Sequence, residues 1–303
     1  MKCVFTFCLL LVITTRASAA VIAGGETVYR VVDGDSLLLI SAKLGVDVTT
    51  IVRENKLTPS QRLTPGKELH VNCRKIAPKT LENGIIVDIA GRMLYYFKAG
   101  ELEMSFPVGL GMPQWHGITR WHTPAGPFTI TGKEQGPVWY VPESIQWQMK
   151  AQGQTVLTEM PPGPDNPLGR FVLYTSMRGI AIHETIWPTT VYRFRSHGCI
   201  RVLSQNMERL YSEVDVGTPG ELVYEPVKVA VTDEGNIFLE VDPDVYRKTK
   251  SLMEEAIDRI DALNVASQVD WGKVIKIVHD QSGNAEDITF FLPSPGASAP
   301  SPE

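Results

Sequence analysis

The stretch RSHGCIR, residues 195–201, places the thiol of Cys199 between a glycine and an isoleucine, two residues after a histidine. A second histidine, His183, ends the apolar stretch GIAIH that lies upstream. Cysteine attacks carbonyl groups as its thiolate, and a neutral thiol needs a nearby base or positive charge to reach that form. A cysteine that only fills a core needs neither, so this stretch predicts a nucleophile at Cys199.

The neighbours of Cys199 can be given chemical roles. His183 and His197 are the candidate bases, and two strands joined by the loop after His183 would bring its ring beside the thiol. Gly198 lets the backbone turn so that successive N–H groups converge on one oxyanion. The planar guanidinium of Arg201 can hold a substrate carboxylate.

Two other interpretations of these side chains remain open at this point. His183, His197 and Cys199 could supply three ligands to a zinc ion, although no second spaced cluster of ligands follows them. Cys199 could also be an inert core residue.

The sequence around the motif is rich in strand patterns. Residues 84–111 alternate β-branched and aromatic side chains, with turn signals at 91–92 and 99–100. FVLYTS (171–176) and GIAIHE (179–184) are typical of buried strands. The spacing of Met207, Leu210, Tyr211 and Val214 predicts a helix. We therefore expect a mainly β catalytic domain with α+β elements over residues 84–225.

His183, the loop after it and SHGCIR (196–201) resemble the signature of L,D-transpeptidases with a YkuD-type domain. The resemblance runs from Asn83 to Glu225 and includes TPAG (123–126) and GPDNPLG (163–169). With a signal peptide and a LysM-like module ahead, the chain resembles the ErfK/YbiS-like branch. The resemblance implies a YkuD-type β-sandwich of mixed strand direction that needs no metal and no organic cofactor.

The resemblance implies that Cys199 is the nucleophile and His183 the general base. In the family, the backbone carbonyl of the residue after the histidine helps to orient that base. This residue is often glycine in the family and is Glu184 here. Any residue supplies the carbonyl, but a bulky carboxylate is expected to alter its geometry or the electrostatics of the site entrance.

The remaining site residues are assigned by the same resemblance or by residue type. His197 and Gly198 shape the oxyanion environment, Ser196 positions the loop, and Arg201 contacts the donor peptide. Trp139 is a candidate for lining a substrate groove. Other aromatic residues share that possibility, although a structural role is the more common one for such residues: Trp115, Trp121, Tyr140 and Trp147. We interpret His116 and His122 as surface or loop histidines.

The implied reaction is acyl transfer from the third residue of a peptidoglycan tetrapeptide stem to an amine, through a thioester on Cys199. A stem diamino acid as acceptor would give a 3→3 cross-link, and a lysine of an envelope protein would attach that protein to the wall. Water as acceptor would make the enzyme a hydrolase of stem peptides or wall-protein linkages. The third alternative is a catalytically silent wall-binding protein.

The first residues predict secretion. MKCVFTFCLLLVITTRASA (1–19) has a basic start, a short apolar run and small residues before a cleavage site after Ala19. The run is too short to span a bilayer comfortably, and no later stretch is typical of a transmembrane anchor. We therefore expect a periplasmic protein that retains only two cysteines, Cys73 and Cys199, after cleavage.

Residues 28–71 form a predicted strand, helix, helix and strand. Asp35 or Ser36 is the expected cap of the first helix, Asn55 follows the second, and a turn at 65–66 precedes the last strand. GDSL (34–37), Asn55 and LTPGKELHV (63–71) resemble the LysM family. That βααβ module implies binding to glycans that contain N-acetylglucosamine, such as the strands of peptidoglycan.

The rest of the chain carries no chemistry that its sequence alone reveals. Residues 72–83 resemble a linker, and residues 226–292 form a helical or mixed C-terminal extension. In this extension Leu252, Ala256, Ile260 and Leu263 predict one helical packing face. Residues 293–303 are expected to be a disordered tail. For Cys73 we consider a reversible disulfide with Cys199 that locks the enzyme, beside the simpler role of a partly buried thiol.

The charge of the chain excludes one class of partner. The formal net charge is -5, and no long run of lysine and arginine occurs. Nucleic acid is therefore not an expected partner.

Overall fold

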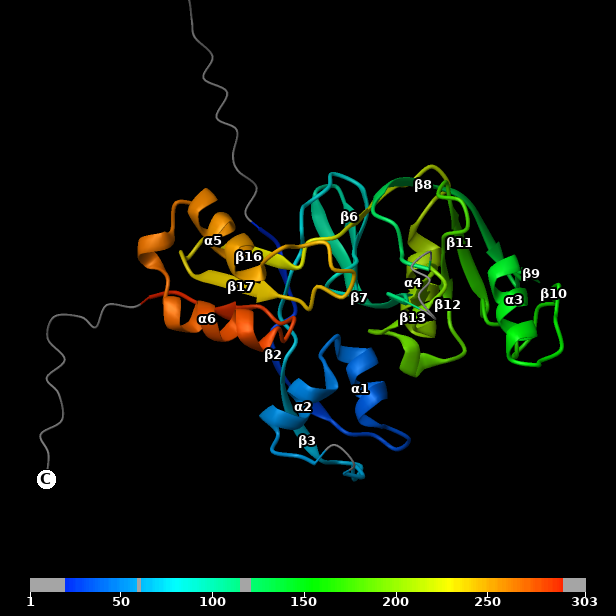
Figure 1. The fold of residues 1–303 in the computed structure, drawn as a ribbon, viewed down its shortest axis with the longest axis horizontal. Coiled ribbons are helices and arrows are strands. Elements are labelled where there is room, and N and C mark those ends of the chain that lie inside the picture. The colour runs from blue at the N-terminus through cyan, green and yellow to red at the C-terminus, as the bar shows by residue number, and fades with distance from the viewer. Residues whose placement is uncertain (1–19, 59–60, 115–120, 291–303) are drawn as a thin grey trace, which may run out of the picture.

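The computed structural model describes residues 20–58, 61–114 and 121–290. The predicted signal peptide 1–19 and the tail 293–303 lie outside the described residues, as do Trp115 and His116. Figure 1 shows three parts: a central body of strands, an N-terminal module below it and a C-terminal layer beside it.

The N-terminal module has the predicted βααβ order. It contains β2 (Glu26–Arg30), α1 (Leu37–Leu44), α2 (Val48–Glu54) and β3 (Glu68–Asn72). β2 pairs antiparallel with β3. Ser36 caps α1, because its hydroxyl accepts from the Leu39 amide at 3.2 Å. The side chain of Asn55 exchanges two hydrogen bonds of 2.8 Å with the backbone of His70, so it holds the end of α2 against β3.

The central body is one mixed sheet that closes on itself. Its strands are β5 (Gly84–Asp88), β6 (Met93–Lys98), β7 (Glu101–Gly111), β8 (Gly126–Gln135), β11 (Phe171–Thr175), β12 (Ala181–Glu184), β13 (Phe194–Ser196), β14 (Ile200–Val202) and β15 (Pro219–Val223). The order is β13-β7-β14-β12-β11-β8-β15-β5-β6, and β6 pairs again with β7. The hairpin turns at 91–92 and 99–100 lie where the sequence predicts them.

Two long strands join the two halves of this sandwich. The first part of β7 pairs with β6, its residues 108–109 pair with β14, and its residues 110–111 pair with β13. In the same way, β8 pairs with β15 through 126–129 and with β11 through 130–135. The alternating apolar side chains of both halves meet in one core, which includes Val108, Ile182 and Ile200. The expected mainly β sandwich of mixed strand direction is thus confirmed.

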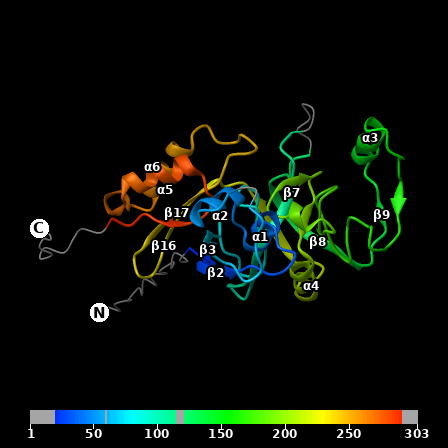
Figure 2. The same ribbon diagram turned by 90° about the horizontal axis from the view of Figure 1, so that it is seen from below.

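Helices and short strands lie around this central body. They are β9 (Trp139–Tyr140), α3 (Glu143–Ala151), β10 (Glu159–Met160), η1 (Pro188–Thr190) and α4 (Ser204–Glu213). In α4, Met207 and Leu210 are fully buried, as the helical spacing predicts. Figure 2 shows α3 and β9 projecting at the end of the molecule that is opposite to α5 and α6.

The C-terminal extension is a small layered unit with its own core. It contains β16 (Val227–Val231), β17 (Ile237–Val241), α5 (Leu252–Ala262), η2 (Ala266–Gln268), α6 (Trp271–Asp280) and β18 (Glu286–Asp287). Ala256 and Ile260 are buried against the strands, whereas Leu263 is 45% exposed. The predicted packing face is therefore wrong at Leu263, because α5 ends at Ala262 and the chain leaves the helix there.

The segment 72–83 packs closely against the rest of the protein. It contains β4 (Lys75–Ile76), which pairs with β1 (Ile22–Ala23). Lys75, Ile76 and Ala77 are all buried. The segment is therefore packed against the protein and does not cross open solvent.

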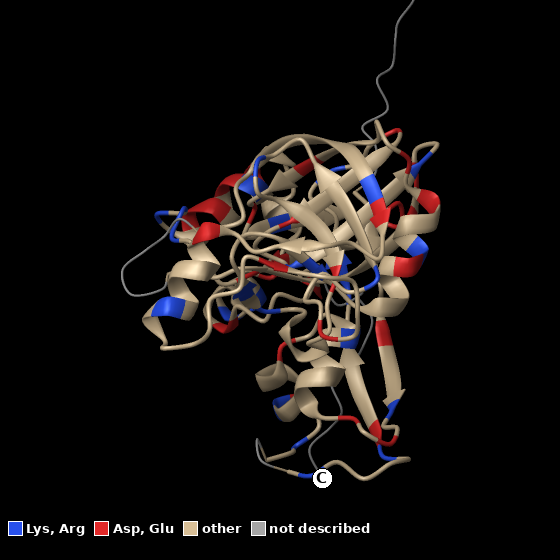
Figure 3. Ribbon diagram, turned by 90° about the vertical axis from the view of Figure 1, so that its right-hand side faces the viewer, with Lys and Arg blue, Asp and Glu red and all other residues tan. Residues whose placement is uncertain are grey.

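Charged side chains are mixed in sign over the surface. Figure 3 shows lysine and arginine interspersed with aspartate and glutamate on the side that faces the viewer. In the part of the chain that the structure describes, no helix combines the length and the apolar character needed to cross a bilayer.

Candidate functional site

A cavity of about 670 Å³ opens at the end of the sheet where β12 and β14 meet. It brings together most of the predicted site residues: His183, Ser196, His197, Cys199, Arg201 and Trp139. Gly198 lies in the turn between two of these lining residues. The motif and the distant histidine therefore share one cavity, as the sequence predicts.

Strand register places the reactive side chains on one face. β12 and β14 run parallel, and His183 lies opposite Arg201. Because side chains alternate along a strand, His183, Arg201 and the preceding Cys199 project to the cavity side. Ile182 and Ile200 project to the other side and are fully buried in the core. The apolar residues of the motif thus anchor the strands, and the polar ones face the cavity.

The ring of His183 is held in one tautomer. Its Nδ1 lies 2.6 Å from the backbone oxygen of Glu184. A carbonyl oxygen can only accept, so Nδ1 carries the proton and Nε2 keeps its lone pair. Burial, aided by the charge of Arg201, lowers the pKa of His183 to about 4. The ring is therefore a neutral base at physiological pH.

The side chain of Glu184 lies away from the cavity. The strand alternation sends it to the opposite face from His183, where it is 7% exposed. Its carboxylate accepts from the Arg170 amide at 2.8 Å and from the Ser204 hydroxyl at 2.6 Å. The expectation that the Glu184 carboxylate changes the electrostatics of the site entrance is therefore wrong. The expected contact between the Glu184 carbonyl and His183 is present.

The thiol of Cys199 is half-buried and protonated at rest. Its Sγ lies 3.4 Å from the backbone oxygen of Gly179. Burial raises the pKa of Cys199, and this outweighs the lowering effect of the Ala181 amide and the charge of Arg201. The resting pair is thus a thiol and a neutral imidazole, and a thiolate forms only when the base takes the proton.

The turn before Cys199 is closed by Ser196. Its hydroxyl donates to the Cys199 carbonyl at 2.6 Å and accepts from the Gly198 amide at 3.1 Å. Gly198 has φ of 115°, a value that side chains other than glycine rarely adopt, and an added Cβ would lie 3.0 Å from Ile180. Ser196 therefore holds the loop as expected. The Gly198 amide already donates to the Ser196 hydroxyl, and the expected contribution of Gly198 to the oxyanion environment stays a prediction.

His197 is held by stacking. Its ring lies 3.9 Å from the ring of Trp121, at an angle of 22°. Burial, followed by the charge of Arg201, lowers the pKa of His197 to about 4, so this ring is also neutral at pH 7. Trp121 is 2% exposed, so the ring of His197 stacks on a buried side chain.

A zinc site does not form from the motif. Within residues 20–58, 61–114 and 121–290, the one group of carboxylates, histidines and cysteines near enough to share an ion is Asp88, Glu240 and Asp242. The ammonium group of Lys228 already lies among these carboxylates. The ligand atoms of His183, His197 and Cys199 do not converge, so the zinc interpretation is wrong.

Aromatic side chains surround the cavity. Trp139 and Trp147 lie in its wall, from β9 and α3 respectively. The guanidinium of Arg201 lies 5.5 Å from the ring of Trp187. Tyr140 is 72% exposed and is not a lining residue.

The sequence does not predict how Thr123 and Tyr246 reach the catalytic loop. The Thr123 hydroxyl donates to the Gly198 carbonyl at 2.8 Å. The Tyr246 hydroxyl, which comes from the C-terminal extension, accepts from the Thr123 amide at 3.1 Å and donates to the Gly111 carbonyl at 2.6 Å. The Tyr246 ring also stacks on His122 at 3.9 Å. The TPAG motif (123–126) could have pointed to Thr123, whereas no motif in the sequence marks Tyr246.

These bonds predict a positioning role for the Thr123 hydroxyl. In Thr123→Val the Gly198 carbonyl loses its donor, and we expect the rate of Cys199 acylation to fall about tenfold, the order of one buried hydrogen bond. Thr123→Ser keeps the hydroxyl and should restore the rate. Thr131→Val, which removes an exposed hydroxyl of β8, serves as the matched control. Equal acylation rates in Thr123→Val and Thr131→Val would contradict the role.

The lowered pKa of His183 predicts the acid limb of the pH profile. We expect the acylation rate to fall as the pH drops through about 4, because His183 then becomes protonated and cannot accept the thiol proton. Above that pH the ring is neutral and the rate should stay level. Acylation of the enzyme, followed by mass spectrometry across pH, measures this. A midpoint near 6.5 would contradict the buried position of the ring.

The comparisons with known proteins identify the family of this chain. A model of the L,D-transpeptidase catalytic domain (YkuD) matches residues 82–229, and a LysM domain model matches residues 29–72. The chain is 32% identical over 235 residues to the probable L,D-transpeptidase ErfK/SrfK of Salmonella typhimurium, across 75% of this chain and 74% of that protein. This chain belongs to the L,D-transpeptidase family. Both predicted resemblances are thereby confirmed.

Other L,D-transpeptidases match over different lengths. The probable L,D-transpeptidase YbiS of Escherichia coli is 30% identical over 177 residues, which cover 58% of this chain and 56% of YbiS. The probable L,D-transpeptidase YcfS of Escherichia coli is 29% identical over 229 residues, which cover 74% of this chain and 70% of YcfS. In this chain the LysM match precedes the match to the catalytic domain.

Proposed function

We propose that this L,D-transpeptidase transfers the acyl group of the third residue of a tetrapeptide stem to an amine of the cell wall. The proposal depends chiefly on one observation: Cys199 and His183 share a cavity, and the hydrogen bond to the Glu184 carbonyl leaves Nε2 of His183 as the basic atom. A neutral thiol beside a neutral base is a nucleophile that becomes active when a carbonyl group arrives.

The first half of the reaction acylates the enzyme. His183 takes the thiol proton while Sγ of Cys199 attacks the carbonyl carbon of the third stem residue. Because the Gly198 amide donates to Ser196, we assign the oxyanion to the amide of Cys199. The terminal residue then leaves as a free amine with the proton from His183, and a thioester remains on Cys199.

The second half releases the acyl group. An acceptor amine attacks the thioester and gives a proton to His183, and the thiol is regenerated when that proton returns to sulfur. The side chain of a stem diamino acid as acceptor makes a 3→3 cross-link, and a lysine of an envelope protein makes a wall anchor. Arg201 lies in the same cavity and is placed to hold a carboxylate of the donor.

The N-terminal features fit a wall substrate. The LysM module would hold glycan strands and raise their local concentration near the cavity. A signal peptide at residues 1–19, cleaved after Ala19, would direct the enzyme to the periplasm, where this polymer lies.

Defined tetrapeptide muropeptides test the proposal. After incubation with the enzyme, mass spectrometry should find cross-linked dimers together with the released terminal residue. Tripeptides without dimers would instead identify a hydrolase. Intact tetrapeptide in the presence of folded enzyme would identify a silent wall-binding protein and overturn the proposal.

A further inference from the structure

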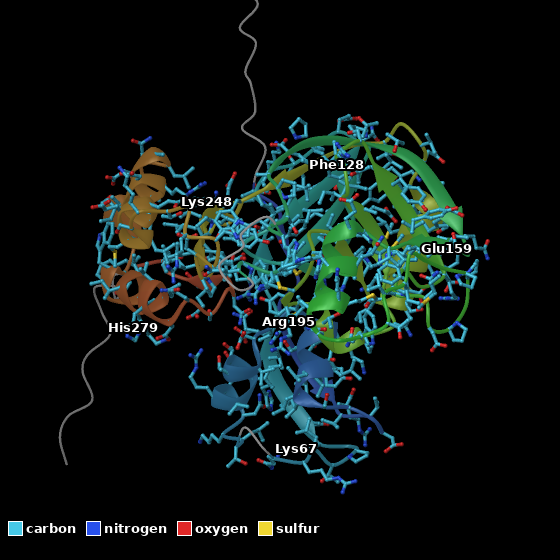
Figure 4. The ribbon with its side chains drawn as sticks, turned by 45° about the vertical axis from the view of Figure 1, so that its right-hand side comes forward. Lys67, Phe128, Glu159, Arg195, Lys248 and His279 are labelled. Carbon is cyan, nitrogen blue, oxygen red and sulfur yellow. The ribbon has the colours of Figure 1, made fainter. Side chains whose placement is uncertain are left out.

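A second cavity lies between the LysM module and the catalytic body. It measures about 590 Å³ and is separate from the Cys199 cavity. One wall comes from α1 and the start of α2, and the other comes from residues 192–195, directly before the catalytic motif. Figure 4 shows Arg195 at the junction of the two parts. We call this cavity the junction groove.

The two parts that form the walls of the junction groove pack closely against each other at Gly45. Gly45, which ends α1 with φ of 68°, lies against the catalytic body. A Cβ added there would lie 3.1 Å from both Met93 and Pro107 and 3.7 Å from the Tyr192 ring. The absence of a side chain at Gly45 therefore allows the two modules to approach closely.

The junction groove carries an excess of positive charge. Arg92, Arg193 and Arg195 line it, whereas Asp47 is its one acidic lining residue. The Asp47 carboxylate already accepts from the Thr49 amide and hydroxyl at the start of α2. Arg92 is also paired with Asp242 at 3.9 Å, so the excess positive charge of the groove comes mainly from Arg193 and Arg195.

These guanidinium groups have N–H donors that a ligand could use. Arg193 and Arg195 flank Phe194, which packs against the core, so the alternation turns both arginines outward. Among the residues that the structure describes, neither arginine has an ion pair. Arg92 is 7% exposed, and its Nε has no hydrogen-bond acceptor in the described part of the chain. A buried donor without an acceptor is costly unless a ligand provides one.

We propose that the junction groove binds carboxylates of the stem peptide that hangs from the glycan strand held by the LysM module. This inference rests on the proposed function, because it takes peptidoglycan as the substrate. Arginine binds carboxylates through paired N–H donors, and three arginines suit a peptide with several acidic groups. Arg195 directly precedes SHGC in the sequence, so the groove and the Cys199 cavity are lined by neighbouring residues of one segment.

Binding can be measured without turnover in the full-length Cys199→Ala protein. The probe is a soluble disaccharide-tetrapeptide with free carboxylates, and a second probe carries carboxamides in their place. We expect Arg193→Gln/Arg195→Gln to raise the Kd for the acidic probe about tenfold or more, as for lost charge-assisted hydrogen bonds. The Kd for the amide probe should be the same before and after this double substitution.

Arg209→Gln/Arg247→Gln is the matched control, because it removes two exposed arginines that do not line the junction groove. An equal rise of Kd in this control, or equal affinity of the Cys199→Ala protein for the two probes, would overturn the proposal. Failure of the proposed function is seen separately, as absence of cross-linked product with the unmodified protein. A Kd that responds to the arginines but not to the control supports the junction groove whichever acceptor the enzyme uses.

Discussion

Replacing Cys199 with serine is expected to reduce acyl transfer by at least about 10³-fold, because a hydroxyl is a far weaker nucleophile than a thiolate. The neutral His183 can draw a proton from a thiol, but the hydroxyl of serine has a much higher pKa. The same substitution should abolish the mass increase that a carbapenem produces on the enzyme. The fold should persist, because Cys199 is half-buried and contacts mainly the Gly179 carbonyl.

Cys73→Ser is the matched control for this prediction. Cys73 packs against the LysM core and donates from Sγ to the Gly25 carbonyl at 3.1 Å. We expect this variant to transfer acyl groups at the rate of the unmodified enzyme. Retention of carbapenem acylation in Cys199→Ser, or its loss in Cys73→Ser, would contradict the assignment of the nucleophile.

The hypothesis of a Cys73–Cys199 lock stays a prediction. Both thiols are free in the structure, and they belong to different surroundings: the LysM core and the catalytic cavity. Counting free thiols in protein purified without reductant tests it. Two free thiols per monomer would exclude the lock.

The second large effect is expected at Lys228, whose ammonium group is buried among three carboxylates. Its Nζ lies 2.6 Å from Asp88, 3.1 Å from Glu240 and 2.8 Å from Asp242. Asp88 ends a strand of the catalytic body, while the other three residues belong to the C-terminal extension. Burial raises the pKa of Glu240 to about 8, whereas at Asp242 the surrounding positive charges, that of Lys228 first, together outweigh burial and lower the pKa of that carboxyl.

Lys228→Met should therefore lower the free energy of unfolding by about 3–5 kcal/mol, the usual loss when one partner of a buried ion pair is removed. At this chain length the melting temperature should fall by roughly 10 °C. Because the ion cluster joins the body to the extension, we expect a chain that ends at residue 225 to be destabilised in the same way. Thermal unfolding followed by circular dichroism measures both effects.

Lys276→Met is the control, because it removes a lysine whose side chain is 62% exposed and is paired with Asp280 on the same helix. Its effect should stay below about 1 kcal/mol. Adding Asp88→Asn to Lys228→Met should recover part of the loss, since it removes one unpaired buried charge. Similar melting temperatures for Lys228→Met and Lys276→Met would show that the cluster does not stabilise the fold.

The amino-acid sequence determined the local parts of this protein. Alternation in GIAIHE and CIRV fixed which side chains enter the core and which face the cavity, because side chains of a strand point to opposite faces in turn. Ser36 and Asn55 likewise marked the ends of the LysM helices, since capping bonds span only a few residues or a fixed neighbouring strand. The prediction of a nucleophile and its base likewise came from the chemistry of a thiol that lies near histidines in the sequence.

The tertiary structure decided how distant residues act on that site. Tyr246 reaches Thr123 and thereby the loop at Gly198, and Lys228 meets Asp88, across separations in sequence of 123 and 140 residues. It also assigned the Gly198 amide to Ser196 and turned Glu184 away from the site entrance. The physical reason is that hydrogen bonds and charge pairs depend on positions in space, which the fold sets through long-range strand pairing and core packing that no local pattern records.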